Sequence, residues 1–221
     1  MYSGDPETDP GTQIREGGVH EKIPRTSSQV PTSPEPGSSD PREPFKDKQL
    51  IQDLARAIDA EPGSENATQA RLLNGFFSVL ALCHSVLTGV NQDTGAIEYK
   101  AQSPDEGALV QAAADVGFIF RGRDKEVLML QTPFSREVER YELLNILEFT
   151  SARKRMSVIV RKLDEEDPRL FLLTKGADNV IFERLKAGND ELKKVTEQHL
   201  DGFASTGLRT LTLAYKVIPG I

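Results

Sequence analysis

The stretch from residue 139 to residue 174 decides the fold, and it contains ERYELLNIL (139–147), MSVIVRKL (156–163) and LFLLT (170–174). The spacing of the apolar residues shifts toward two in this part of the chain, so each segment is predicted to be a β-strand. The polar sequence DEEDP (164–168) lies between the last two. Because strands joined by such short connections pair antiparallel, the centre of the domain is predicted to be an antiparallel sheet.

Further elements are predicted on both sides of this stretch. Period-two segments predict strands at 118–121, 126–131 and 208–217. Helical spacing or helix-start signals predict helices at 45–60, 68–87, 103–116, 178–187 and 190–204. The second of these helices is apolar over most of its circumference and is expected in the core, with Asn66 as a cap or loop residue before it. Together these elements predict the α+β class, a twisted, mostly antiparallel sheet flanked by helices.

The first 45 residues differ in composition from the rest of the chain. They hold most of its 13 prolines and few apolar residues. Such a segment cannot bury enough surface to offset the entropy lost on ordering. We therefore expect a disordered tail or linker over residues 1–45, followed by one folded domain over residues 46–221.

The overall composition excludes several classes of protein. The net charge of −7 argues against non-specific binding to nucleic acid. No run approaches the roughly 18 apolar residues that a membrane helix needs, and the N-terminus does not resemble a signal peptide. The single cysteine, Cys83, lies in an apolar run, and the histidines have no metal-ligand spacing. A soluble, monomeric domain with a buried structural thiol is expected.

The segment Ser103–Glu106, with the sequence SPDE, has two interpretations. As a capping box, Ser103 would cap a helix that starts at Pro104, and Glu106 would return to the Ser103 amide. Alternatively, Glu106 would accept a hydrogen bond from the amine of a ligand. The pattern alone favours the cap.

The segment EFTSARKRMS (148–157) places three basic residues after an aromatic one. Phe149 would stack on a flat ring, while Arg153 or Lys154 would balance phosphate charge. The alternative is a core phenylalanine beside a solvated basic turn. Neither interpretation is favoured by the sequence.

Two further segments lie at predicted strand ends. In KGAD (175–178), Gly176 would let a ligand approach closely, and Lys175 would face an anion near the start of the next helix. The alternative is an ordinary turn with Asp178 as the helix cap. After the predicted helix stop at Gly207, Arg209 offers a planar, permanently charged group suited to phosphate, although a lone arginine most often forms a surface ion pair.

Taken together and in this order, the four segments resemble the nucleotide-binding domain of P-type ATPases. AQSPDE (101–106), RKRMS (153–157) and KGAD (175–178) are similar to the lipid-flippase (type IV) branch of that family. The resemblance covers residues 70 to 217, and in its details it is strongest to fungal members.

The resemblance implies a role in ATP binding for each matched residue. Phe149 would stack on the adenine ring, and Glu106 would accept a hydrogen bond from the adenine amino group. Lys175 would line the base and sugar pocket and approach the phosphates, and Arg209 would reach the phosphate chain. Secondary contacts with ATP are implied for Thr150, Ser151, Lys154 and Gly176.

The resemblance also limits what these 221 residues would do alone. The family is phosphorylated on the aspartate of an Asp-Lys-Thr-Gly-Thr motif that this sequence lacks. No catalytic residue and no metal ligand is therefore expected here, and the fragment would bind ATP, weakly and without turnover. The alternatives are the corresponding domain of an ion pump, or a non-catalytic protein-interaction module.

The parent protein that the resemblance implies is an ATP-driven phospholipid translocase. It would use Mg²⁺ to transfer the γ-phosphate to its own aspartate. The partners of this domain would be the phosphorylation and actuator domains of the same chain, and a membrane accessory subunit would bind elsewhere on the parent. The domain would lie on the cytosolic face of the plasma, Golgi or endosomal membrane.

Overall fold

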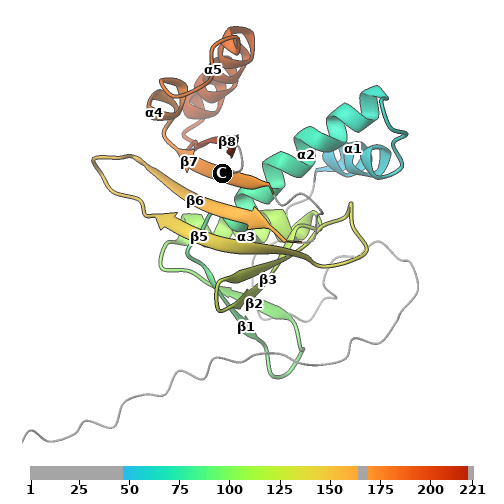
Figure 1. Ribbon diagram of the computed structural model, residues 1–221. Helices are drawn as coiled ribbons and strands as arrows, with labels where there is room; N and C mark the ends of the chain where they lie inside the picture. Colours follow the sequence, from blue (N-terminus) through green and yellow to red (C-terminus); the bar gives the residue numbers. More distant parts are fainter. Residues whose placement is uncertain (1–46, 164–168, 219–221) are drawn as a thin grey trace, which may run out of the picture.

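The computed structural model describes residues 47–163 and 169–218 and confirms the α+β class. Six strands form one antiparallel sheet in the order β3-β4-β5-β6-β7-β8, and two more form a separate hairpin (Figure 1). The predicted tail over 1–45 and the DEEDP connection lie outside the described residues. The elements are α1 (Lys48–Ile58), α2 (Glu65–Leu82), β1 (Leu87–Val90), β2 (Ile97–Lys100), α3 (Pro104–Asp115), β3 (Ile119–Asp124), β4 (Val127–Gln131), β5 (Glu139–Leu147), β6 (Arg155–Lys162), β7 (Leu170–Gly176), α4 (Asp178–Phe182), α5 (Asp190–Ser205) and β8 (Thr212–Ile218).

The C-terminal part of α2 anchors the hydrophobic core. Phe77 and the run Val79–Leu82 are buried, and α2 contacts α3 and strands β3, β4, β7 and β8. The prediction that this helix lies in the core is wrong for the turns before Phe77, where Leu72 and Phe76 are 63% and 51% exposed. Within the described ranges, no helix is long and apolar enough to cross a membrane.

The start of α2 also differs from the prediction. The helix begins at Glu65 because the Ser64 hydroxyl caps it, accepting a hydrogen bond from the Ala67 N–H at 3.1 Å. Asn66 therefore lies inside the first turn and is not the cap. The Ser64 cap lies four residues before the predicted start at residue 68, so the helix is three residues longer at this end.

The register of the sheet brings four strand ends to one edge, here called the site edge. Leu147, the last residue of β5, pairs with Ser157 near the start of β6. Gly176, the last residue of β7, pairs with Arg155 of β6 and with Thr212 of β8. The segments around residues 149, 175 and 209 therefore converge on the site edge although they are far apart in the sequence.

The end of α5 explains why β8 begins later than the predicted residue 208. Gly207, with φ at 80°, donates its N–H to the Ala204 carbonyl at 2.9 Å, and Leu208 donates to the Phe203 carbonyl at 3.1 Å. This pair of bonds is a Schellman motif, which terminates the helix and uses residues 207–208 to do so. Although all sixteen residues of α5 are described, none is buried, and Figure 1 shows the helix projecting away from the sheet.

Candidate functional site

A carboxylate–lysine ion pair forms the inner part of the candidate site. Glu106 lies in the first turn of α3, and Lys175 is the second-last residue of β7. The Lys175 Nζ lies 3.4 Å from the Glu106 Oε1, and their side chains are only 8% and 14% exposed. The period of two along β7 places Lys175 on the same face as buried Leu173, beneath the helices, so the lysine points inward.

Ser85 is the second partner of Glu106 and was not among the predicted site residues. Its N–H donates to the Glu106 Oε1 at 3.1 Å, and its hydroxyl donates to Oε2 at 2.7 Å. The predicted capping box is wrong, because Glu106 turns to Ser85 and Lys175 instead of the Ser103 amide. The Ser103 side chain makes no capping bond to the described residues. No local pattern around Ser85 marks it, since the contact joins residues that are far apart in the chain.

These contacts fix the charge of Glu106. Partial burial acts to raise the pKa of its carboxyl, but the hydrogen bonds from Ser85 and the charge of Lys175 outweigh that effect and lower the pKa. The carboxylate is therefore ionised at neutral pH, and an ionised carboxylate only accepts hydrogen bonds. Glu106 thus provides an acceptor suited to an amine or an amide.

The loop between β5 and β6 supplies an exposed aromatic ring at the site edge. Phe149 is 62% exposed, so its interpretation as a core residue is wrong. The loop is held by its own turn, in which Lys154 donates its N–H to the Thr150 carbonyl at 2.8 Å. The Lys154 carbonyl accepts from the Ala177 N–H at 3.0 Å and so joins the loop to the start of α4. Thr150, Ser151 and Lys154 themselves are exposed.

Gly176 packs against the neighbouring strand and does not border an open space that a ligand could enter. A Cβ at this position would lie 2.5 Å from the Arg155 Cβ and 2.6 Å from the Lys154 carbonyl oxygen. The close approach that requires a glycine is therefore that of β6 to β7. The prediction that Asp178 caps α4 is also wrong, because the cap position is occupied by Ala177.

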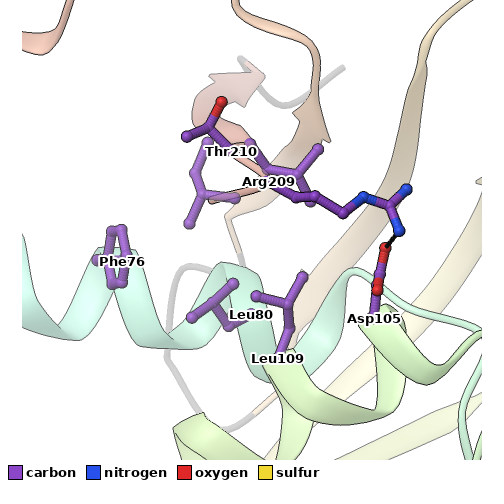
Figure 2. A pocket seen from close by; sticks show the side chains of 8 residues that line it. Phe76, Leu80, Asp105, Leu109, Arg209 and Thr210 are labelled. Atoms are coloured by element: carbon purple, nitrogen blue, oxygen red, sulfur yellow. Dashed lines mark ion pairs between the residues drawn. The ribbon is translucent and has the colours of Figure 1, made fainter. Parts of the chain in front are cut away.

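Arg209 lies just before β8 and pairs with Asp105, the neighbour of Glu106. The Arg209 Nη1 lies 2.6 Å from the Asp105 Oδ2, and these side chains are 86% and 51% exposed. The pair lies beside a cleft of about 370 Å³ between α2, α3 and the segment before β8. Figure 2 shows the side chains that line this cleft. The residues that line the cleft are Phe76, Leu80, Asp105, Leu109, Arg209, Thr210, Leu211 and Leu213.

The structure thus joins some predicted site residues directly and gathers the others at the same edge. Glu106 and Lys175 are in contact, while Arg209 contacts the residue next to Glu106. Phe149 lies on the loop that leaves the site edge from β5. An acceptor, two cations and an exposed ring are the groups that a base carrying an amine and a phosphate chain would require.

The described residues contain no group of three or more histidine, cysteine, aspartate or glutamate side chains that could hold a metal ion. The nearby Cys83 is buried, and burial raises the pKa of its thiol to about 11. His84 is also buried, and burial lowers its pKa to about 4. Both groups are therefore neutral at physiological pH and belong to the packing behind the site.

A family model described as "P-type ATPase, cytoplasmic domain N" matches residues 73–220. The probable phospholipid-transporting ATPase 11 of Arabidopsis thaliana is 48% identical over 153 residues, which cover 67% of this chain and 12% of the relative. The phospholipid-transporting ATPase dnf2 of Schizosaccharomyces pombe is 45% identical over 171 residues, which cover 77% of this chain and 11% of the relative. The chain therefore spans about an eighth of the length of the curated relatives that it matches.

Proposed function

The chain belongs to the P-type ATPase family and corresponds to the cytoplasmic domain N of these proteins. We propose that this domain binds ATP at the site edge. The observation that carries this proposal is the Glu106–Lys175 pair, which holds an ionised acceptor and a cation together at the end of the sheet from which the loop with Phe149 leaves β5. Both side chains are largely buried before any ligand binds, so this part of the site is preorganised.

Phe149 and Glu106 would recognise the base. An aromatic ring that is 62% exposed gains most from stacking on a flat ligand ring, because stacking removes apolar surface from water. Glu106 would accept a hydrogen bond from the exocyclic amine of adenine, since its ionised carboxylate can only accept. The hydroxyls of Thr150 and Ser151 would add secondary contacts from the same loop.

The cations would bind the sugar and phosphate part of ATP. Lys175 would line the base and sugar pocket, and Arg209 would reach the phosphates with Lys154 in support. In the structure Lys175 pairs with Glu106 and Arg209 pairs with Asp105, so phosphate must compete with two carboxylates. With one stacked ring and competition for its cations, the isolated domain would bind ATP in the high-micromolar to millimolar range.

The role of the domain in its parent follows from the family. We propose an ATP-driven phospholipid translocase in which this domain presents the γ-phosphate to an aspartate of a separate phosphorylation domain. Mg²⁺ would accompany ATP and find its protein ligands mainly outside this domain. The phosphorylation and actuator domains would be its partners at the cytosolic face of a plasma, Golgi or endosomal membrane, and an accessory subunit would bind the membrane part.

The test is an amide NMR titration of the domain with ATP. Wild type, Phe149→Ala and Lys175→Ala would be compared with Tyr215→Ala, whose ring is also 62% exposed but lies on β8 opposite Leu173. We expect shifts around Glu106 and the β5–β6 loop in wild type and in Tyr215→Ala. Each site variant should weaken ATP binding at least about tenfold, because Phe149→Ala removes the stacked ring and Lys175→Ala removes a charged contact.

Two outcomes would contradict the proposal. If several millimolar ATP shifts no resonance of the folded wild type, the protein-interaction alternative replaces it. If Phe149→Ala binds ATP as well as Tyr215→Ala does, the base lies elsewhere on the domain.

A further inference from the structure

Ser85 holds both carboxylate oxygens of Glu106. The N–H of Ser85 reaches Oε1 at 3.1 Å and its hydroxyl reaches Oε2 at 2.7 Å. Two donors from one residue, on two oxygens, fix the plane of a carboxylate as well as its position. Lys175, at 3.4 Å from Oε1, adds charge without fixing that plane.

The backbone of Ser85 is itself held firmly. His84 and Val86 on either side are buried. The His84 Nδ1 accepts from the Val86 N–H at 3.1 Å, so its Nε2 carries the proton and donates to the Ala81 carbonyl at 2.8 Å. Ser85 is therefore an exposed residue between two buried ones, in the segment that joins α2 to β1, and it is placed independently of α3. A residue with this geometry can transmit a fixed orientation to the side chain that it binds.

We propose that Ser85 is a positioning residue of the nucleotide site, which orients the carboxylate of Glu106 and thereby sets the preference for adenine over guanine. The proposal rests on the ATP site proposed above. A carboxylate held in one plane offers its free lone pairs in fixed directions. The exocyclic amine of adenine donates to such an acceptor, whereas guanine presents a carbonyl oxygen at the corresponding position and would be repelled.

The loss of the Ser85 hydroxyl has two separable consequences. The carboxylate keeps the N–H bond but gains freedom to rotate, which weakens the directional bond to adenine. The pKa of Glu106 rises toward its usual value, because the hydroxyl bond is one of the contacts that lower it. The second consequence is measurable without nucleotide and reports on the contact itself.

The experiment compares Ser85→Ala, Ser85→Thr and wild type in the intact domain. Dissociation constants for ATP and for GTP would be measured by calorimetry or NMR, and the Glu106 carboxyl would be titrated by ¹³C NMR. We expect Ser85→Ala to weaken ATP binding about fivefold and GTP binding less than about twofold, with the Glu106 pKa raised. Ser85→Thr keeps the hydroxyl and should restore all three values.

Ser103→Ala is the matched control. This serine lies three residues before Glu106, but its side chain makes no capping bond within the described part of the chain, so ATP binding and the Glu106 titration should not change. Amide spectra of every variant would verify that the fold is retained.

The possible results separate the two proposals. If wild type binds no ATP, the proposed function fails and the positioning role fails with it. If wild type binds ATP and Glu106→Gln reduces the preference for ATP over GTP, while Ser85→Ala behaves as wild type, only the role of Ser85 is overturned. An equal loss of ATP and GTP affinity in Ser85→Ala, with no change in the Glu106 titration, would also overturn it, because a merely structural serine would act in that way.

Discussion

The candidate site has an inner half and an outer half, which the fold holds in different ways. The inner half consists of Glu106, Lys175 and Gly176. Glu106 contacts Lys175 and Ser85, Gly176 lies against β6, and α2 contacts the elements α3 and β7 that carry these residues. The outer half consists of Phe149, which is 62% exposed, and Arg209, whose side chain is 86% exposed. Adjacent carboxylates in one helical turn thus make one buried ion pair, with Lys175, and one exposed pair, with Arg209.

Because of this difference, substitutions in the inner half should change the stability of the fold, and substitutions in the outer half should change ligand binding. Residues of the inner half cannot change without disturbing core contacts, so their substitutions are expected to alter the free energy of unfolding. Residues of the outer half make few contacts that folding depends on, and their substitutions should act mainly on the ligand. The inner half is already ordered, whereas a ligand must order the outer half and bear the entropic cost.

The largest effect is expected for Gly176→Ala, which tests whether the inner half is part of the folded core. The added Cβ would lie 2.5 Å from the Arg155 Cβ and 2.6 Å from the Lys154 carbonyl oxygen. Arg155 belongs to the paired strand β6, and the Lys154 oxygen is backbone directly before it, so neither can move as the far end of a flexible side chain would. We expect the free energy of unfolding, measured by urea denaturation, to fall by about 3 kcal/mol. This value is at the upper end of the usual cost of overpacking a core.

Gly202→Ala provides the matched control, because this glycine lies inside α5 and a Cβ there would meet nothing within 4 Å. The control should be stabilising by up to about 1 kcal/mol, the difference in helix propensity between the two residues. Equal stability of Gly176→Ala and wild type would mean that β6 and β7 separate easily at the site edge.

The next effect concerns His84, which lies behind the inner half and next to Ser85. Burial lowers its pKa from 6.5 in the unfolded chain to about 4 in the folded protein. As the pH falls below 6.5, the unfolded chain takes up a proton that the folded protein does not, so folding becomes less favourable. Between pH 7 and pH 5 this group alone should lower the free energy of unfolding by about 2 kcal/mol.

The measurement compares urea denaturation at pH 7 and pH 5 for wild type and His84→Gln. The variant should be less stable at pH 7, because it disturbs a buried site, but its stability should depend less on pH. His199→Gln, at an exposed position on α5, should keep the dependence of wild type. If the free energy of unfolding of His84→Gln depends on pH as that of wild type does, another group takes up the proton.

The sequence predicted the strands of the large sheet because their signals are local. β5 was predicted at the residues where it lies, and β4, β6 and β7 differ by no more than two residues at either end. Their apolar residues and polar connections indicate the element, but burial does not alternate along β6 or β7, so the pattern does not give the exposed face. The short strands β1 and β2 were not among the predicted strands, since four residues are too few to show a period and β1 also includes a glycine.

The candidate site could be predicted less completely, because its geometry depends on tertiary contacts. The sequence SPDE satisfies the capping-box pattern, yet Glu106 bonds to Ser85 and Lys175, 21 and 69 residues away. A sequence pattern shows the hydrogen-bond partners that lie nearby in the chain, but not those that only the tertiary fold brings close. The matched motifs pointed to Glu106, Lys175 and Arg209, but not to the contact of Ser85 with Glu106 or of Asp105 with Arg209.

The smallest effect is expected for Asp105→Asn, which removes the exposed ion pair of the outer half. Pairs in which both side chains are this exposed contribute about 0–1 kcal/mol, so the free energy of unfolding should change by less than about 0.5 kcal/mol. The Arg209 guanidinium is then free to bind phosphate, and ATP affinity should rise by up to about threefold at low salt. High salt should abolish the gain, because it screens exposed charges.

Asp190→Asn is the control for this variant. Asp190 occupies the first turn of α5 as Asp105 occupies that of α3, so both substitutions remove the same charge from the start of a helix. Calorimetric titration with ATP should show tighter binding for Asp105→Asn only. Weaker binding would mean that Asp105 directs Arg209 toward the phosphates instead of competing with them, and the outer half would then be preorganised in the same way as the inner half.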